Sequence, residues 1–352
     1  MKKSLLALAI LGASAGVVQA QSSVVIYGSV DAGMIKRTDS SLAIGKRLNN
    51  TLGFKGTEDL GNGLKAIFQL EMRYEPDTGT LESGSRPLFQ GQSRVGLTGG
   101  FGTLRVGRGL TAFQESSIAF EPFHGIPSPA GFQADLTVAG YTSDPLSPTG
   151  NSANRFSNAV WYNSPEFMGI QINTTIATKE ANNGVKVDGR GTALNPQYPA
   201  LVGGPVASAN PYSISATWKN GPGALMLAAE RNAVESTVQQ FAGYVMVMPV
   251  TKLMFSITRQ DQSHTRVLNQ NTKAWVLGAN HTIGAGKILA GIGAKSTDGM
   301  AKVKQMTLGY EYSLSKRTYI YADVSQKKGA PITATNTKNT LKHIDLGINH
   351  SF

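Results

Sequence analysis

The side chains with the clearest chemical potential gather in one stretch, residues 109–155. The stretch contains four carboxylates and is bounded by two arginines: Glu115, Glu121, Asp135 and Asp144, with Arg108 and Arg155. Charged groups of this kind act on a passing solute through their electrostatic field. The sequence therefore favours an electrostatic site here.

Metal and nucleophilic chemistry receive less support. The five histidines fall on separate segments without metal-ligand spacing, and the chain has no cysteine: His124, His264, His281, His343 and His350. We therefore expect neither a metal site nor a cofactor. His124 is the exception to watch, because it lies in the charged stretch and a titrating imidazole there would modulate a current. The polar positions show no Ser-His-Asp grouping, so a barrel enzyme such as a lipase or protease is the less favoured alternative.

The charged stretch is unusually long for a connection, and it contains five prolines. A loop of roughly 45 residues in a compact protein is either functional or disordered. One interpretation is a surface insertion. The other is a loop folded into a cavity, where apolar residues such as Phe113, Ile118, Phe120 and Phe123 give it something to pack against.

The first residues have the pattern of an export signal. Lys2 and Lys3 precede an apolar run from Leu5 to Val18, and a small residue follows at Ala20. This predicts a secretory signal peptide over residues 1–20 and a mature protein over 21–352. Past Ala20 no run approaches the roughly 18 apolar residues of a membrane helix, so a membrane protein of this sequence would have to be a barrel. A soluble exported protein is the other possibility.

Composition points toward a surface that water does not fully cover. Charged residues make up 16% of the chain, against about 25% in a typical soluble domain. The formal charge is +11 (33 minus 22), and it falls to +9 once Lys2 and Lys3 are removed. A basic balance suggests anionic partners such as lipopolysaccharide or permeating anions. Export makes nucleic acid the least favoured partner, and we expect none.

The mature chain alternates between apolar and polar residues in several segments. Three examples are residues 64–74, 307–314 and 343–352, where one parity is apolar and the other polar. This period of two predicts strands with one apolar face. Short glycine-rich joints such as 59–63 alternate with long polar connections such as 179–210, which is typical of an outer-membrane barrel. We predict an all-β fold, an antiparallel transmembrane barrel of sixteen strands, although eighteen fit the length as well.

Five motifs then resemble the general diffusion porins of β-proteobacteria. They are SSVVIYGSVDAG (22–33), GFKGTEDLGNGLKAIFQLE (53–71), VGLTGGFGTLRVGR (95–108), YNSPEF (162–167) and GYEYSLSKRT (309–318). The resemblance extends over the mature chain and includes a terminal phenylalanine. It implies a sixteen-stranded barrel in the bacterial outer membrane, a homotrimer, and a third loop folded inward as the constriction. The implied function is passive diffusion of ions and small hydrophilic solutes, with a substrate-specific channel as the alternative.

The resemblance also implies arginines on the wall opposite the loop, and only some are present. Two usual arginine positions hold Thr51 and Gly91, whereas Arg108 and Arg155 match the pattern. Parity counted from Gly91 puts Arg94 on the opposite face, so we expect Arg94 at a subunit contact or a rim.

The predicted constriction combines the acidic loop with what remains of the basic wall. Its members are Thr51, Lys55, Arg108, Glu115, Glu121, Asp135 and Arg155. We expect a transverse field across the passage and a weak anion preference. Arg155→Ala should shift the reversal potential toward cations, and Glu121→Gln should shift it the other way.

Other basic residues are expected in solvated loops or at the mouth of the barrel. They are Lys36, Arg37, Lys46, Arg47, Lys327, Lys328 and Lys338. Their functional interpretation is contact with lipopolysaccharide phosphates or collection of anions.

Deleting Phe352 should lower the folded yield in the outer membrane more than it changes conduction. The resemblance motivates this, because the family ends in an aromatic residue that the insertion machinery recognises. Quantifying the folded protein in outer-membrane fractions tests it, and an unchanged yield would remove the idea.

Overall fold

The computed structural model describes residues 23–82, 87–138, 140–144, 153–178, 209–233, 235–261, 271–331 and 337–352. The predicted signal peptide, residues 1–20, and His264 lie outside these ranges.

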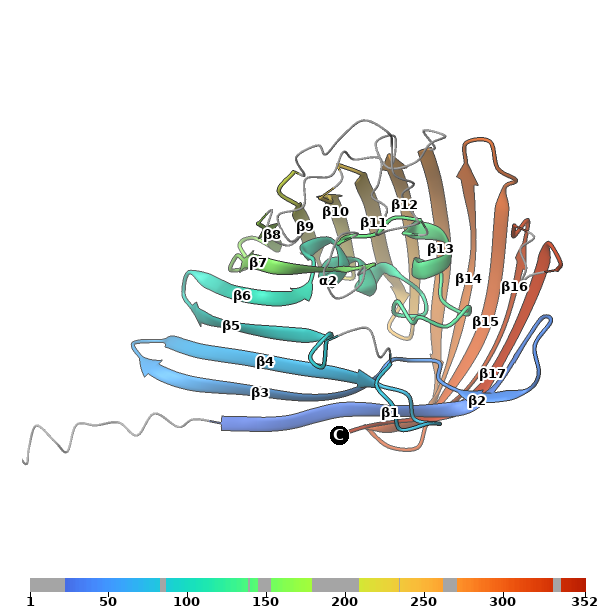
Figure 1. Ribbon diagram of the computed structural model, residues 1–352, viewed down its shortest axis with the longest axis horizontal. Helices are drawn as coiled ribbons and strands as arrows, with labels where there is room; N and C mark the ends of the chain where they lie inside the picture. The colour runs from blue at the N-terminus through green and yellow to red at the C-terminus, as the bar shows by residue number, and fades with distance from the viewer. Residues whose placement is uncertain are drawn as a thin grey trace, which may run out of the picture.

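Within these ranges the chain forms sixteen long strands and one short strand, β2 (Ala43–Gly45). The long strands are β1 (Ser23–Arg37), β3 (Asn50–Gly61), β4 (Leu64–Tyr74), β5 (Gln92–Gly99), β6 (Gly102–Leu110), β7 (Arg155–Asn163), β8 (Ile170–Ala177), β9 (Tyr212–Asn220), β10 (Gly223–Arg231), β11 (Thr237–Met248), β12 (Thr251–Asp261), β13 (Asn271–Ile283), β14 (Gly286–Thr297), β15 (Val303–Ser313), β16 (Thr318–Lys328) and β17 (Thr340–Ser351). Each long strand pairs antiparallel with its neighbours, and β1 pairs with β17, so the sheet closes on itself (Figure 1). The predicted sixteen-stranded barrel is confirmed.

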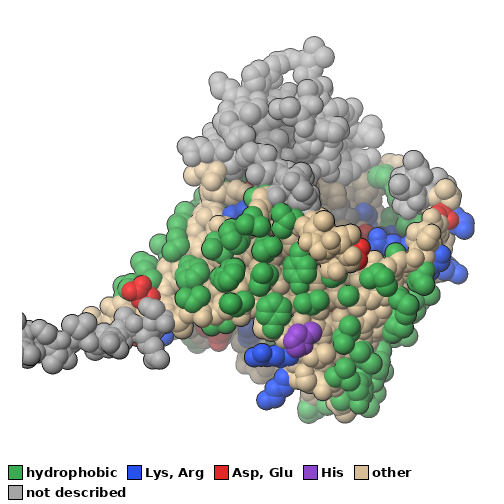
Figure 2. Space-filling view, turned by 60° about the horizontal axis from the view of Figure 1, so that its bottom comes forward, with side chains coloured by type: hydrophobic (Ala, Val, Ile, Leu, Met, Phe, Trp, Pro, Cys, Tyr) green, Lys and Arg blue, Asp and Glu red, His purple; other side chains and the backbone are tan. Residues whose placement is uncertain are grey.

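Alternation along each strand separates an apolar outside from a polar inside. On β17 the outward Ile344, Leu346 and Ile348 are 52%, 50% and 46% exposed, whereas the inward Asp345 and Asn349 are each 1% exposed. Figure 2 shows one side of the wall, where hydrophobic side chains dominate and Lys and Arg side chains lie mainly toward the edges. Apolar surface of this extent suits a lipid environment and not water.

The end of the chain completes the closure. Backbone bonds join the N–H of Gly28 to the carbonyl of Phe352 at 3.1 Å, and the N–H of Phe352 to the carbonyl of Gly28 at 3.0 Å. A Cβ at Gly28 would lie 2.7 Å from the Phe352 ring and 2.2 Å from the Thr51 carbonyl oxygen. Glycine is therefore required where β1, β3 and the last residue meet.

The third long connection leaves β6 and packs against the inside of the wall (Figure 1). It contains helix α2 (Ala112–Ser117), the 3₁₀ turn η1 (Ile118–Phe120) and the π-helical turn η2 (Gln133–Thr137). Two buried clusters join it to the barrel. Their loop members are Phe113, Phe120, Val138 and Tyr141 in the first, and Phe123, Ile126, Ala130, Phe132 and Leu136 in the second. The wall supplies Ala224, Met226, Ala228, Val238 and Ala242 to the first, and Ala274, Val276, Leu289 and Val303 to the second.

Glycines on the inward faces of β13, β14 and β15 make room for this loop. A Cβ at Gly278 would lie 2.5 Å from Pro122, and one at Gly291 would lie 2.5 Å from the Phe132 ring. Gly293 and Gly309 have the same relation to Leu136 and Phe123, at 2.7 Å each. The absence of side chains at these four strand positions therefore leaves room for the loop, which occupies one side of the lumen.

Gly291→Val should dislodge the loop and enlarge the pore. The added carbons cannot coexist with the Phe132 ring, and overpacking of this kind costs about 1–3 kcal/mol. Single-channel recording in a planar bilayer should show larger or more variable conductance steps. Ala290→Val is the matched control, because Ala290 is the adjacent residue on the outward face. Equal conductance in the two variants would contradict the assigned seat.

Candidate pore constriction

Helix α2 is docked on the wall through its first turn. The first N–H groups of a helix lack partners within the helix. Here the N–H of Ala112 donates to the Thr175 hydroxyl at 3.0 Å, and that of Phe113 donates to the Ser213 hydroxyl at 2.8 Å. Thr111 caps the same turn. Hydroxyls of β8 and β9 thus hold α2 at a fixed depth in the lumen.

Glu115 projects from α2 toward two arginines of the wall. Its Oε1 lies 2.7 Å from an Nη of Arg94 on β5, and its Oε2 lies 3.0 Å from an Nη of Arg105 on β6. Arg94 also donates from Nε and Nη2 to the Gln69 amide oxygen at 3.1 and 2.9 Å. These contacts fix both guanidinium groups around a single carboxylate, and the cluster has a net charge of +1.

The expectation for Arg94 was wrong. It does not lie at a rim or a subunit contact, because its cross-strand partner is Gln69 on the inward face of β4. The parity count failed because β5 begins at Gln92. The backbone is irregular at Gly91, where a Cβ would meet the Glu71 side chain at 2.3 Å. Alternation cannot be extended backward through that point.

Arg105 was missing from the predicted constriction. It sits between Leu104 and Val106, two exposed apolar residues on the outward face of β6. The period of two over these three residues would have placed Arg105 inside. The prediction followed the arginine positions of the family and named Arg108 instead.

Thr51 and Lys55 face the lumen from β3. The hydroxyls of Thr51 and Ser29 lie 3.3 Å apart. The Lys55 ammonium lies over the Tyr27 ring, 5.1 Å from its centroid, and Lys55 is exposed. Lys55 therefore presents a cation to the same space as Arg94 and Arg105.

The structure places Arg108 and Arg155 away from this space. Arg108 pairs in register with Ser93, which in turn pairs with the outward Leu70, so Arg108 lies on the face opposite Arg94. Arg155 is only 5% exposed, and its Nε donates to the Gly91 carbonyl at 2.7 Å. Both had been predicted to line the constriction. Alternation along β6 itself places Arg108 outward, three residues after the inward Arg105, and the register shift between Gly107 and Gly109 concerns the pairing with β7, the strand that Arg155 begins.

Glu121 is part of the loop's own framework and not of the passage. It is buried, and its two oxygens accept the backbone N–H groups of Gly125 at 2.6 Å and Phe132 at 2.8 Å. Burial raises the pKa of Glu121, which those N–H groups oppose. Glu121→Gln would therefore disturb loop folding, so it is not a clean test of ion selectivity.

The other two carboxylates are also engaged at the wall. Asp135 on η2 forms an ion pair with Lys327 of β16. Asp144 is buried at the far end of the loop. Among the four loop carboxylates, Glu115 is the one that the structure brings to the paired arginines.

Two lumen cavities of about 500 and 330 Å³ meet at Glu115. The charged residues of the first are Lys55, Arg94, Arg105 and Glu115. Those of the second are Glu115, Glu166, Lys219 and Lys252. Together the two linings hold five basic residues and two acidic ones, a surplus of three positive charges.

Two features are absent from the described ranges of the chain. Among the described residues, no helix is both long enough and apolar enough to cross a membrane. Within those ranges no three His, Cys, Asp or Glu side chains converge in a way that would hold a metal ion.

Comparison with known proteins gives the family. The family model described as Gram-negative porin matches residues 7–330. The chain belongs to the Gram-negative porins. It is 29% identical over 377 residues to outer membrane porin protein 32 of Delftia acidovorans and 27% identical over 417 residues to an outer membrane porin protein of Bordetella pertussis, with both chains fully covered in each case.

Solved structures agree in fold. An anion-selective porin from Comamonas acidovorans superposes with a TM-score of 0.74 at 23% identity, over 94% of this chain and all of the other. An in-vitro folded outer membrane protein of Vibrio cholerae, OmpT, gives 0.66 at 12% identity, over 94% and 99% of the two chains. This porin is thus an outer-membrane barrel through whose water-filled lumen ions and small hydrophilic solutes diffuse. By the usual rule for such barrels, the short turns face the periplasm and the long connections face the exterior.

A cluster of Ser128, His343 and Asp345 anchors the loop of the porin to β17. The Ser128 hydroxyl donates to an Asp345 oxygen at 2.6 Å and lies 3.1 Å from Nε2 of His343. The same Nε2 lies 2.6 Å from the same Asp345 oxygen. A hydrolytic triad needs the two ring nitrogens to serve serine and aspartate separately. Here one nitrogen faces both, and all three residues are buried.

His124 lies in the loop with a positive φ of 56° and is exposed to the lumen. Enclosure by the barrel, with Lys287 nearby, lowers its pKa to about 4. The imidazole of the porin is therefore neutral at pH 7. Because the folded pKa lies below the ordinary value of about 6.5, the neutral ring stabilises the loop above that pH, and this contribution is lost as the pH falls through about 4.

Ion selectivity should accordingly be insensitive to His124 at neutral pH. His124→Ala should match the parent from about pH 8 to pH 6 and diverge only near pH 4, where the parent ring gains a positive charge. Reversal potentials at a series of pH values measure this. His281→Ala is the control, since His281 pairs with the outward Ile288. A difference between His124→Ala and the parent at pH 7 would contradict the assignment.

Proposed function

We propose that this porin passes small anions in modest preference to cations, through a constriction formed by Glu115 on the loop and by Arg94, Arg105 and Lys55 on the wall. The observation that supports this is the excess of five basic over two acidic residues around the cavities that meet at Glu115. The similar Comamonas acidovorans protein, described as an anion-selective porin, points the same way.

The preference is modest because the strongest cations are already partly neutralised. Arg94 and Arg105 share Glu115 within hydrogen-bond distance, so a passing ion experiences their residual charge and not two free cations. Lys55 and Lys219 are exposed and add to it. Charges within a Debye length of about 8–10 Å act on a permeating ion, while more distant ones are screened. Loop carboxylates such as Asp135 are already paired with the wall and therefore contribute little to the ion preference.

Arg105→Ala should shift the reversal potential in a salt gradient toward cations. The substitution lowers the net lining charge from +3 to +2, about a third of the surplus. The shift should shrink as salt is raised, because screening increases. Measurement in a planar bilayer at two salt levels gives both quantities.

Arg108→Ala is the matched control for this test. It removes the same charge from the same strand, but on the outward register beside Ser93. Arg108→Ala should leave the reversal potential near that of the parent. Equal shifts in the two variants would mean that overall charge, and not the Glu115 cluster, sets selectivity.

We also propose a homotrimer. The outward apolar positions of the first and last strands offer contact surface, as at Met34 and Leu346, which pair in register and are 45% and 50% exposed. The Vibrio cholerae protein is described in a trimer form. Mass measurement in mild detergent should give three chains, dissociating on heating. A monomer under all detergent conditions would exclude it.

Contact with lipopolysaccharide and other lipids of the outer membrane follows from the exposed apolar wall and its basic rim. An enzymatic role is not favoured, because the Ser128, His343 and Asp345 arrangement lacks the geometry of a triad. A solute-specific channel would require saturable conductance with one solute, and concentration series on the parent protein separate that from free diffusion.

A further inference from the structure

The outward face of the barrel carries a row of lysines at the exterior ends of neighbouring strands. Lys304 of β15 pairs directly with Lys328 of β16. Lys342 of β17 pairs with Gln326, two residues from Lys328, and Lys36 of β1 pairs with Ile344, two residues from Lys342. All four lysines are exposed. Direct cross-strand neighbours lie about 5 Å apart at Cβ and diagonal ones about 7–8 Å apart, so the four side chains leave the sheet within one small area.

This arrangement is electrostatically unfavourable by itself. Like charges directly opposite one another destabilise a strand pair. Among the described residues none of these four lysines forms an ion pair, since the nearby acids are engaged elsewhere. Asp39 is held by Thr337 and Lys338, and Asp298 accepts from Asn271. A second cationic pair, Arg259 with Lys273, continues the row on β12 and β13. An anion bridging the lysines would relieve the repulsion.

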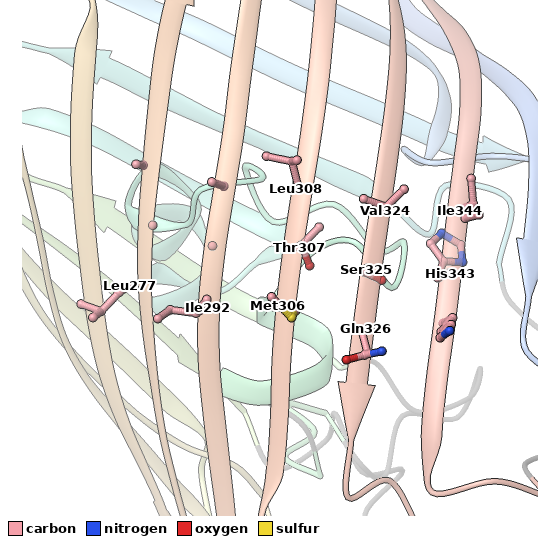
Figure 3. Close-up of a pocket in the computed structure, with 15 residues that line it drawn as sticks. Leu277, Ile292, Met306, Thr307, Leu308, Val324, Ser325, Gln326, His343 and Ile344 are labelled. Atoms are coloured by element: carbon pink, nitrogen blue, oxygen red, sulfur yellow. The ribbon is translucent and has the colours of Figure 1, made fainter.

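An apolar groove of about 780 Å³ lies directly beneath the row on the membrane-facing wall. Its floor is formed where two small residues, Ala279 and Ala290, pair with each other. Its sides are Leu277, Ile292, Met306, Leu308, Val324 and Ile344. In Figure 3, Leu277, Ile292, Met306 and Gln326 lie at nearly one level across four strands, which the register also gives. Lys342 belongs to the lining, so the groove reaches the lysine row.

We propose that this site binds a phosphorylated glycolipid of the outer leaflet, lipopolysaccharide, with its lipid phosphate on Lys304, Lys328 and Lys342 and an acyl chain in the groove. The lysines supply charge-assisted donors to phosphate. The groove supplies apolar surface that is contiguous with them. The inference deepens the lipid contact proposed above and rests on it, and it fixes which strands and which residues make that contact.

The position of the row selects the outer leaflet. Lys328 ends β16 and Lys342 lies near the start of β17, on either side of a long connection that faces the exterior. Phospholipids of the inner leaflet would meet the opposite end of these strands, where Lys316 and Arg317 form the short turn after β15. The two lipid classes therefore predict different residues.

The test compares lipid binding to two double variants of the full-length protein. The porin, freed of lipid in detergent, is titrated with diphosphoryl lipid A and analysed by native mass spectrometry. Lys328→Gln with Lys342→Gln should weaken binding by on the order of 25-fold, since each lysine near an anionic lipid surface contributes about fivefold. Lys316→Gln with Arg317→Gln removes the same charge at the periplasmic end and should bind like the parent.

A third variant, Ala279→Phe, separates the groove from the charges. It fills the floor without changing the charge and should weaken lipid A binding while leaving the single-channel conductance unchanged. Conductance should be unaltered in all three variants. The lipid test therefore does not depend on the proposed ion selectivity.

Four results would overturn the site. The first is undiminished lipid A binding by the lysine variant, and the second is an equal loss of lipid A binding by the periplasmic control. The third is that phosphatidylcholine is retained as well as lipid A, and the fourth is loss of the trimer in place of loss of lipid. The last would mean that a neighbouring protomer covers this face.

Discussion

The structure depends on one constraint, that every backbone donor and acceptor crossing the hydrocarbon layer must find a partner in the chain. In sheet form this requires closure, because an open edge would leave a row of N–H and C=O groups without water. The pairing of β1 with β17, completed by the bonds between Gly28 and Phe352, meets the requirement. Closure in turn gives every strand alternating lipid-facing and lumen-facing residues. The apolar outside and the polar inside both follow from it.

A closed barrel of sixteen strands leaves a lumen too wide to be selective by its wall alone, and packing of the third loop reduces it. The loop is held by apolar contacts with small residues, such as Phe132 against Gly291, and by hydrogen bonds that dock α2 at Thr175 and Ser213. Buried Glu121 joins two parts of the loop through its backbone bonds to Gly125 and Phe132. The position of the proposed constriction is therefore decided by packing complementarity, which sets where the charges of Glu115, Arg94 and Arg105 lie.

Charge has different roles at three levels of the molecule. Glu115 between Arg94 and Arg105 is a partly compensated cluster beside open cavities, where a small residual charge can act on a passing ion. Pairs such as Lys327 with Asp135 fasten the loop and leave little field. The outward Lys304 and Lys328 pair with each other, have no ion-pair partner among the described residues, and belong to the proposed lipid site. The same residue types thus have different partners according to the face and height at which they lie.

The sequence by itself determined the barrel, because a period of two is a local property of each strand. The alternation in residues 64–74 and 343–352 assigned outward and inward faces correctly. The residues of the constriction required the tertiary structure. Arg108 lies in the outward register of β6, the irregular start of β5 concealed the inward Arg94, the loop's own fold buries Glu121, and the buried Arg155 is bonded to the Gly91 carbonyl. One residue of slippage reverses the face of every side chain beyond it. Register and loop packing arise from contacts between distant parts of the chain, and no local pattern contains them.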